Sequence, residues 1–411
     1  MKYGLIGEKL GHSFSKEIHE KLGRYSYELL ELAPDEVEDW MRARDFAGFN
    51  VTIPYKQTVI PFLDEITERA RAIGAVNTVV NRKGKLLGDN TDFGGMEALI
   101  RRMGLDLNGK KVLIAGTGGT SKTAAAVAEK LGAGEILRLS RSEKDGSISY
   151  EQAYREHGDA RILIHTTPAG MYPKSDGIAV NLENLPCLEG LVDVVYNPLT
   201  TRLVREARER GIKAENGLYM LVAQAVLAAE DFTGDSFGDE VIEDIFREIV
   251  FEKRNIVLTG MPSSGKSTLG RILAGRLGRE LVDTDERIVE HAGIPITEIF
   301  SRFGEKHFRE MEAEVIKNVS ESGGKIIATG GGAILRKDNV DTLKSNGTIV
   351  FLDRDPEALI PTDDRPLADD REKIRRLYEE RYPRYMAAAD IRIEIRGVPE
   401  NTAEELLRRL K

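Results

Sequence analysis

The segment "TGMPSSGKST", residues 259–268, has the residue types and spacing of a loop that binds nucleotide phosphates. Gly260 and Gly265 frame the loop, and Lys266 and Ser267 complete the pattern G-x-x-x-x-G-K-[ST] without a mismatch. In such a loop backbone amides surround the phosphates, the lysine neutralises their charge and the hydroxyl binds Mg²⁺. We therefore expect ATP here. Further ATP contacts are expected from Ser263, Ser264 and Thr268.

Two acidic residues end the next predicted strand, in "LVDTDERI". Asp283 and Asp285 are two positions apart, which places both on one side of an extended strand. One carboxylate can hold Mg²⁺ together with Ser267, and the other can orient or deprotonate an acceptor hydroxyl. The alternative is a pair of surface acids at a helix start. The preceding phosphate-binding loop favours the first interpretation.

Arginines and consecutive glycines further along the chain indicate what the acceptor carries. Arg309 lies in "GEKHFREME" and Arg381 in "RYPRY", both on predicted helices. Gly330, Gly331 and Gly332 follow the predicted strand "KIIA". Two guanidinium groups beside an open glycine backbone are suited to a carboxylate. The acceptor is therefore expected to be an acid with a free hydroxyl.

A second glycine-rich turn lies earlier in the chain. Gly116, Gly118 and Gly119 follow the apolar run "KVLIA" and precede an alanine-rich helix, so amides at the helix start can face a pyrophosphate. The match to G-x-G-x-x-G is imperfect, because Ser121 occupies the place of the third glycine. The alternative is an ordinary tight turn between a strand and a helix. We favour a dinucleotide site.

The strand that follows this turn indicates which dinucleotide. About 20 residues on, where an NAD site needs an acid for the ribose hydroxyls, "EILRLSRS" ends in Ser140 and Arg141. A cation there suits the 2′-phosphate of NADP. Glu143 is close by and keeps NAD open as the alternative. We predict NADP.

The first hundred residues contain polar side chains in places that core packing does not require. Each alone has an ordinary structural interpretation, as a helix cap, a turn residue or a surface cation. Together they describe a polar pocket that contains Lys56 and Asp92. Such a pair suits carbonyl reduction, where a nicotinamide supplies hydride and a proton must reach the new alkoxide. The other members are Ser13, Ser15, Asn50, Thr52, Asn77 and Asn90.

The composition of the chain limits the class of protein. The 411 residues are 41% hydrophobic and 31% charged, with a net charge of −9 from mixed signs, which argues against binding to nucleic acid or anionic membranes. Cys187 is the only cysteine, and neither a signal peptide nor a membrane-spanning run is recognisable. We expect a cytoplasmic protein that acts on small molecules. No oligomeric state is predicted.

Strand-like apolar runs alternate with amphipathic segments along the whole chain, which is typical of α/β architecture with parallel sheets. The runs group into a substrate-binding lobe at 1–104, completed by helices from 218–250, a dinucleotide domain at 105–250 and a phosphate-loop domain at 255–411. A helix predicted at 239–250 and four residues, "FEKR", separate the last two. We therefore expect two enzymatic units on one chain.

The first 250 residues resemble shikimate dehydrogenase through an ordered series of segments: "HSFSKEIH", "FNVTIPYK", "GAVNTVV", "GDNTDFGG", "TTPAGM", "DVVYNP" and "NGLYMLVAQA". The resemblance implies a two-lobed enzyme with a Rossmann-type NADP domain that reduces 3-dehydroshikimate to shikimate. It implies Lys56 and Asp92 as the catalytic pair. Its substrate residues would be Ser13, Ser15, Thr52, Asn77 and Gln224, and Thr166, Tyr196, Gly217 and Met220 would lie near the nicotinamide or the substrate. The family's usual Asn-Arg-Thr is Ser-Arg-Ser here, which retains the arginine.

The last block is similar to shikimate kinase from its phosphate loop through "DTD", "FR", "GGG", "DRP" and "ERYPRY". This resemblance implies a domain like the nucleoside monophosphate kinases, with a parallel sheet, that phosphorylates the 3-hydroxyl of shikimate. Arg309, Arg381 and the three glycines would grip the acid, and Asp285 would lie at its hydroxyls. Arg365 would be the lid arginine, although the segment around it is several residues shorter than in the family and lacks a second arginine.

The combined prediction is a bifunctional enzyme of aromatic amino-acid biosynthesis that uses NADPH, ATP and Mg²⁺. One alternative is a dehydrogenase that also accepts quinate with NAD. Another is a regulator that binds shikimate and ATP without turnover. The intact set of Lys56, Asp92, Lys266 and Asp285 argues against the regulator.

Overall fold

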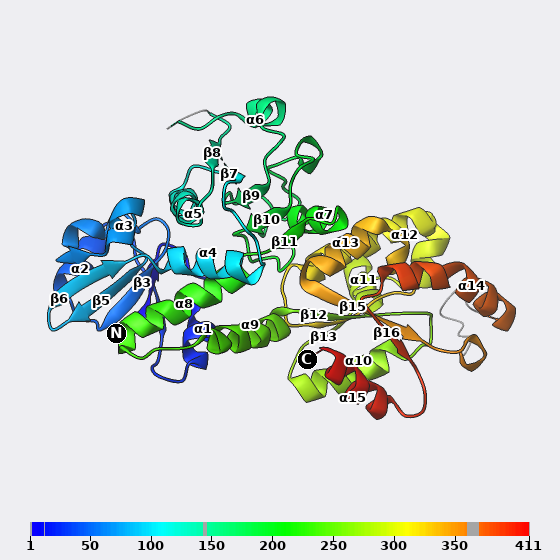
Figure 1. Ribbon diagram of the computed structural model, residues 1–411. Coiled ribbons are helices and arrows are strands. Elements are labelled where there is room, and N and C mark those ends of the chain that lie inside the picture. The colour runs from blue at the N-terminus through cyan, green and yellow to red at the C-terminus, as the bar shows by residue number, and fades with distance from the viewer. Residues whose placement is uncertain (1, 12, 143–145, 360–369, 411) are drawn as a thin grey trace. The chain divides into compact units, whose positions relative to one another are not determined.

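The computed structural model describes residues 2–11, 13–142, 146–359 and 370–410 (Figure 1). The chain divides into two compact units. One comprises Met1–Asn197 with Thr201–Ile249, and the other comprises Pro198–Thr200 with Val250–Lys411. Each unit is built from sheets covered by helices, so the predicted α/β class is confirmed. Within the described ranges, no helix is both long and apolar enough to cross a membrane.

The first sheet of the first unit is mixed and has the strand order β2-β1-β3-β5-β6-β4. Strands β2, β1 and β3 are parallel, whereas β5 is antiparallel to both of its neighbours. The strands are β1 (Tyr3–Gly7), β2 (Glu28–Glu31), β3 (Gly48–Val51), β4 (Glu65–Ile66), β5 (Thr78–Arg82) and β6 (Lys85–Asp89). The helices are α1 (Ser15–Lys21), α2 (Val37–Ala43), η1 (Ile60–Phe62), α3 (Glu68–Ile73) and α4 (Thr91–Arg102).

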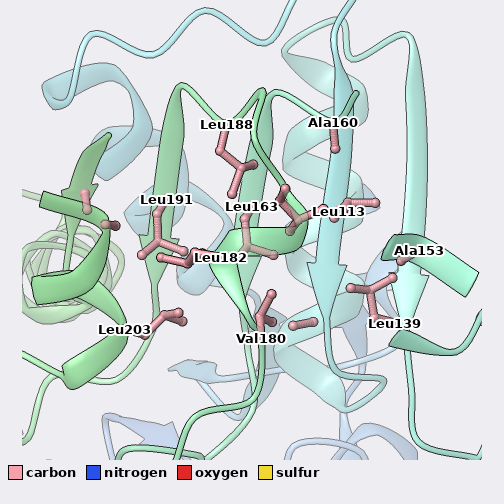
Figure 2. Packing of buried hydrophobic residues seen from close by; sticks show 14 of the residues in the cluster. Leu113, Leu139, Ala153, Ala160, Leu163, Val180, Leu182, Leu188, Leu191 and Leu203 are labelled. Atoms are coloured by element: carbon pink, nitrogen blue, oxygen red, sulfur yellow. The ribbon is translucent and has the colours of Figure 1, made fainter. Parts of the chain in front are cut away.

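The second sheet of this unit is parallel throughout, with the order β11-β10-β9-β7-β8. Its inner strands β7, β9 and β10 are almost entirely buried, as expected for a sheet covered on both faces. Leu113, Leu139, Leu163 and Leu191 from four strands pack in one buried cluster (Figure 2). The strands are β7 (Lys111–Ala115), β8 (Glu135–Leu139), β9 (Ile162–His165), β10 (Gly190–Asp193) and β11 (Lys213–Glu215). The helices are α5 (Gly119–Lys130), α6 (Tyr150–Glu156), η2 (Leu182–Asn184) and α7 (Arg202–Glu209).

After β11 the chain returns to the first sheet. Helix α8 (Leu218–Thr233) packs along α4 and also contacts α1 (Figure 1). Gly95 on α4 permits this close approach, because a Cβ there would lie 2.6 Å from the Met220 carbonyl oxygen. The side chains on this face of α8 are thereby held beside β5 and the start of α4. Helix α9 (Asp239–Lys253) follows.

The sheet of the second unit is parallel, with the order β13-β14-β12-β15-β16. The phosphate-loop strand β12 is central, so its carboxyl end is flanked by the ends of β14 and β15. The strands are β12 (Asn255–Thr259), β13 (Leu281–Asp283), β14 (Ile326–Ala328), β15 (Gly347–Asp353) and β16 (Ile391–Glu394). The helices are α10 (Lys266–Leu277), α11 (Thr284–Ala292), α12 (Ile296–Ser320), η3 (Ala333–Leu335), α13 (Lys337–Asn346), η4 (Pro356–Ala358), α14 (Arg371–Ala388) and α15 (Pro399–Leu410).

The structure differs from the sequence-based expectation in two elements. Strands β5 and β6 form an antiparallel hairpin, because Lys83 and Gly84 both have positive φ, 55° and 89°, as a two-residue hairpin turn requires. The predicted linker "FEKR" was wrong as a separate segment, since α9 continues through Lys253 and only Arg254 precedes β12. The linker sequence contains neither Gly nor Pro to end the helix earlier.

Candidate active sites

The lysine and aspartate predicted to act together are in direct contact. Lys56 lies in the turn after β3 and Asp92 in the first turn of α4. Lys56 Nζ is 2.5 Å from Asp92 Oδ2, and the two side chains are 24% and 14% exposed. Asn90 caps α4 by accepting a hydrogen bond from the Phe93 amide at 3.3 Å. A carboxylate is favoured in the first turn of a helix, so the start of α4 is a stable position for the Asp92 carboxylate.

Asn77 and Gln224 meet on one side of this pair. Asn77 Oδ1 accepts the Thr91 amide hydrogen at 2.7 Å, next to Asp92. Asn77 Nδ2 donates to Gln224 Oε1 at 3.5 Å, and the Thr91 hydroxyl lies 3.4 Å from the same oxygen. Asn77 and Gln224 are both buried. They are therefore held in fixed orientations by the start of α4, even though α8 supplies Gln224.

The predicted serines and threonine follow two neighbouring parallel strands. Ser13 and Ser15 come after β1, and Thr52 comes directly after β3, where its amide donates to the Ile6 carbonyl at 3.0 Å. The Ser13 hydroxyl donates to Ser15 Oγ at 3.1 Å. Because parallel strands end at the same edge of a sheet, these hydroxyls and Lys56 belong to one edge.

The glycine turn after β7 has the form expected for a dinucleotide site. Gly116 has φ +117° and donates its amide hydrogen to the Leu139 carbonyl at 3.0 Å. Around Gly118 and Gly119, where α5 begins, a Cβ would meet no atom within 4 Å, so the helix start is open to a phosphate. Ser121 replaces the third glycine without leaving an unpaired polar group, because its hydroxyl donates to the Gly118 carbonyl at 2.7 Å.

The strand end expected to select the dinucleotide adjoins this turn. Ser140 and Arg141 directly follow Leu139, whose carbonyl binds Gly116. Ser140 Oγ accepts the Ser142 amide hydrogen at 3.3 Å, and the side chain of Arg141 is exposed. Glu143 lies outside the described residues. A phosphate on the ribose at this edge would therefore meet a cation.

The remaining residues predicted near the nicotinamide lie on loops of the second sheet and on α8. The Thr166 hydroxyl donates to the Ala115 carbonyl at 2.8 Å, directly before Gly116. The Tyr196 ring lies 5.4 Å from the Phe14 ring, and burial raises the pKa of Tyr196. A Cβ at Gly217 would overlap the Val194 carbonyl, so only glycine fits there. Met220 is buried in the first turn of α8, one turn before Gln224.

The phosphate loop of the second unit folds around its own lysine. Gly260 and Gly265 have φ +150° and +97°, which the motif requires, and Ser263 has φ +62°. Lys266 Nζ donates to the carbonyls of Gly260 and Met261 at 3.0 and 2.9 Å. Helix α10 begins at Lys266, so its amides face the loop. Ser264 is buried within the loop, whereas Thr268 is exposed on α10.

The two aspartates after β13 do not lie along one strand, so that part of the expectation was wrong. Asp283 caps α11 by accepting the Asp285 amide hydrogen at 3.0 Å, and Asp285 is already helical. The cap turns the chain, which separates the two carboxylates. Asp283 Oδ2 accepts the Ser267 hydroxyl at 2.8 Å, whereas Asp285 faces Gly330, where a Cβ would lie 2.6 Å from Asp285 Oδ1.

The arginines and glycines of the second unit line one cavity of about 590 Å³. Its other polar walls include Ser267, Asp283 and Asp285, with Glu286 and Glu290 further along α11. Phe300 and Phe308 form an apolar side. The Gly331 carbonyl accepts a hydrogen bond from the Tyr385 hydroxyl at 2.6 Å, which holds the backbone of the three glycines in place. The predicted members of this wall are Arg309, Gly330, Gly331, Gly332 and Arg381.

The first unit is similar to proteins of a known family. Residues 5–79 match the model of the shikimate dehydrogenase substrate binding domain. The NADP(+) shikimate dehydrogenase of Clostridium perfringens strain ATCC 13124 is 36% identical over 264 residues, which cover 60% of this chain and 97% of that protein. That of Geobacillus kaustophilus is 38% identical, covering 56% and 92%. The chain belongs to the shikimate dehydrogenase family.

Solved shikimate dehydrogenases match the same unit. A chorismate mutase/shikimate 5-dehydrogenase fusion protein from Clostridium acetobutylicum has a TM-score of 0.57 at 35% identity, covering 60% of this chain and 96% of that chain. The Thermus thermophilus enzyme in complex with NADP(H) and shikimate has a TM-score of 0.55 at 30% identity, covering 60% and 99%. Residues 262–411 match the shikimate kinase model. The chain thus joins a unit of the shikimate dehydrogenase family to a region that matches the shikimate kinase model.

Sequence reasoning missed one buried group that contacts Arg309 on the cavity wall, and it could not place another group. Glu312 is fully buried, its Oε2 lies 2.8 Å from Arg309 Nη1, and burial raises its pKa. The three-residue spacing from Arg309 was a signal for this pairing on α12. Among the described residues, none donates a hydrogen bond to Glu312 Oε1 or accepts one from Arg381 Nε. Arg365 lies outside the described residues.

Proposed function

We propose that the chain catalyses two consecutive reactions, the NADPH-dependent reduction of 3-dehydroshikimate and the ATP-dependent phosphorylation of the shikimate formed. The observation that carries the proposal is that each unit holds a complete reactive set. The first has the Lys56–Asp92 contact of 2.5 Å beside buried Asn77, and the second has Asp285 and Arg309 on the cavity next to its phosphate loop. The relatives named shikimate dehydrogenase and the shikimate kinase match support both halves.

In the reduction, Lys56 is the proton donor. Bound NADPH supplies the hydride to the carbonyl carbon of the substrate. As negative charge develops on the carbonyl oxygen, the Lys56 ammonium donates a proton to it, and Asp92 orients that ammonium through their hydrogen bond. The ring hydroxyls and the carboxylate of the substrate are assigned to hydrogen-bonding side chains on both sides of this pair. These are Ser13, Ser15, Thr52, Asn77 and Gln224.

The residues present fit NADP. The open start of α5 at Gly118 and Gly119 suits the pyrophosphate, with Gly116 forming the turn, and exposed Arg141 with Ser140 suits the 2′-phosphate. Thr166, Tyr196, Gly217 and Met220 are assigned to the nicotinamide side. We assign 1–104 with 218–250 to the substrate lobe, the rest of 105–250 to the NADP domain, and 255–411 to the kinase.

In the phosphorylation, the chain mainly positions and neutralises charge. Lys266 and the loop amides bind the ATP phosphates, with Ser263, Ser264 and Thr268 alongside. Arg309, Arg381 and residues 330–332 hold the shikimate carboxylate. Asp285 accepts a hydrogen bond from the attacking 3-hydroxyl and takes up its proton. Arg365 is retained as the proposed lid residue over the nucleotide.

The residues also fit Mg²⁺. Ser267 and Asp283 bring a hydroxyl and a carboxylate oxygen within 2.8 Å of each other at the phosphate loop. In the described part of the chain, no cluster of three or more His, Cys, Asp or Glu side chains is arranged to bind a metal. Mg²⁺ commonly keeps several waters and binds one or two protein groups plus phosphates, so a small ligand set suffices. When bound, the ion neutralises charge on the transferred phosphoryl group.

The test is a coupled reaction with the purified full-length chain. Given 3-dehydroshikimate, NADPH and Mg-ATP, it should consume NADPH and then form ADP and shikimate 3-phosphate. Without ATP the reaction should stop at shikimate. Failure to oxidise NADPH would contradict the first half of the proposal, and failure to convert added shikimate would contradict the second half independently.

A further inference from the structure

The NADP domain contains a buried imidazole that the proposed chemistry does not use. His165 ends β9 and is 1% exposed, and Asp193 ends β10 and is fully buried. The two strands are parallel neighbours in which His165 and Asp193 occupy the same register. Their side chains meet at the carboxyl edge of the sheet, with Nδ1 of His165 2.8 Å from Oδ1 of Asp193.

The hydrogen bonds around Asp193 determine where the imidazole carries its proton. Asp193 Oδ1 also accepts the Val195 amide hydrogen at 3.1 Å, and Oδ2 accepts the Thr201 hydroxyl at 2.6 Å. A carboxylate can only accept, so Nδ1 of His165 must donate. In a neutral imidazole Nε2 is then an acceptor, which requires a donor on its other side.

Thr167 is that donor. Its Oγ1 lies 2.5 Å from His165 Nε2 and also accepts the Ala169 amide hydrogen at 3.3 Å. The hydroxyl therefore gives its only proton to the imidazole and receives one from the backbone. All polar groups in this chain of hydrogen bonds are satisfied, which gives the loop after β9 one preferred arrangement.

Both ends of the network lie on loops assigned to the nicotinamide side. Thr167 follows Thr166, whose hydroxyl binds the carbonyl of Ala115 next to the dinucleotide turn. Val195 precedes Tyr196. The two loops are also joined directly, because the Tyr172 amide donates to the Asn197 carbonyl at 3.0 Å. One buried imidazole and carboxylate thus brace the loops that carry Thr166 and Tyr196.

We infer that His165 and Asp193 are positioning residues for the nicotinamide half of NADPH, acting through Thr167 and Val195 without touching the cofactor. The inference rests on the proposed dehydrogenase function. Their burial excludes direct contact with a ligand, whereas the adenosine half is assigned to Gly116–Gly119 and Arg141, which follow β7 and β8. The two halves of the cofactor should therefore respond differently to a change in this network.

The test changes Thr167, because His165 and Asp193 are buried and their variants can fail to fold. Thr167→Val keeps the shape but removes the donor to His165, and Thr167→Ser restores it. Loss of this hydrogen bond should weaken NADPH binding roughly fivefold or more and lower kcat as well. The KM for 3-dehydroshikimate should change less than about twofold, since Asn77 and Gln224 are untouched.

Binding of 2′,5′-ADP, which lacks the nicotinamide, gives the discriminating measurement. Titration of NADPH fluorescence and calorimetry with 2′,5′-ADP should show that Thr167→Val weakens only the former, while Thr167→Ser resembles the wild type in both. Equal losses for both ligands, or no loss of NADPH affinity, overturn the inference. A wild-type chain that does not bind NADPH overturns the proposed function along with it, whereas an active wild type with an insensitive variant overturns the inference alone.

Discussion

Replacement of Lys56 by methionine separates its role in chemistry from its role in stability. Methionine keeps most of the aliphatic chain and removes the ammonium that lies 2.5 Å from Asp92. The pair is near the surface, with side chains 24% and 14% exposed, so its loss should cost about 1 kcal/mol of unfolding free energy. Loss of a general acid lowers kcat by about 10²–10⁴, equivalent to about 3–5 kcal/mol of activation free energy. The kinetic effect should therefore far exceed the effect on stability.

The assay is NADPH oxidation at saturating 3-dehydroshikimate, together with thermal unfolding of the same sample. For a domain of this size, 1 kcal/mol shifts Tm by about 2–4 °C. Lys56→Arg is the matched control, because it keeps the positive charge beside Asp92 but does not release a proton at neutral pH, so Tm should be retained and kcat lost. Kinase activity on added shikimate should be normal in both variants. A kcat within about threefold of the wild type in Lys56→Met would remove Lys56 from the chemistry.

Four further measurements address other groups. Arg141→Asp should lower the kcat/KM ratio of NADPH to NADH by about tenfold or more, since a charge-assisted contact to the 2′-phosphate is lost, and an unchanged ratio would refute the assignment. Lys266→Ala should leave NADPH oxidation intact but stop the coupled reaction at shikimate, so any substantial shikimate 3-phosphate would contradict its role. Arg309 contacts two carboxylates, exposed Glu305 and buried Glu312. Glu312→Gln removes the buried one and should raise the KM for shikimate roughly tenfold, whereas an unchanged KM would mean that Glu312 does not hold the arginine. Burial and then neighbouring Asp89 raise the pKa of Asp231 to about 6, so the folded chain retains a proton that the unfolded chain loses near its ordinary pKa of about 4. The unfolding free energy should therefore fall by about 1 kcal/mol as pH rises from about 4 through 6, after allowance for solvent screening. The Tm of Asp231→Asn should exceed that of the wild type at pH 8 but not at pH 4.

Local patterns predicted the parts of both sites that depend on the backbone of one segment. Gly116, Gly260 and Gly265 occupy positive φ at strand-to-helix turns, as their motifs require. The residues alone predicted Lys56 and Asp92, 36 positions apart, as members of a shared pocket, and the family resemblance implied that they act as a pair. The sequence showed both residues among other polar side chains, but it is the strand order of the first sheet that brings their segments together.

Features that depend on burial or on neighbouring strands could not be found from spacing alone. Asp285 was predicted to lie on a strand, whereas helix α11 already begins one residue before it. The sequence could not decide this, because a helix cap by Asp283 is as compatible with it as an extended run. Glu312 has the helical spacing from Arg309, yet most such pairs lie at the surface and only the packing of α12 buries this one. His165 sits within the apolar run "ILIH", and its partner is 28 residues away on a strand whose adjacency the sequence does not state.

The hydrogen bonds of Lys266 to the Gly260 and Met261 carbonyls have a thermodynamic consequence for the nucleotide cycle. A phosphate that binds Lys266 as proposed would exchange these bonds for new ones instead of adding bonds to a free ammonium. The loop carbonyls would thus compete with ATP for the lysine, which lowers the net gain from binding. The same exchange favours departure of ADP, because the lysine recovers two acceptors when the phosphates leave. A Lys266 variant would therefore lose less ATP affinity than the contacts between lysine and phosphate alone suggest, because its hydrogen bonds to the loop carbonyls are lost as well.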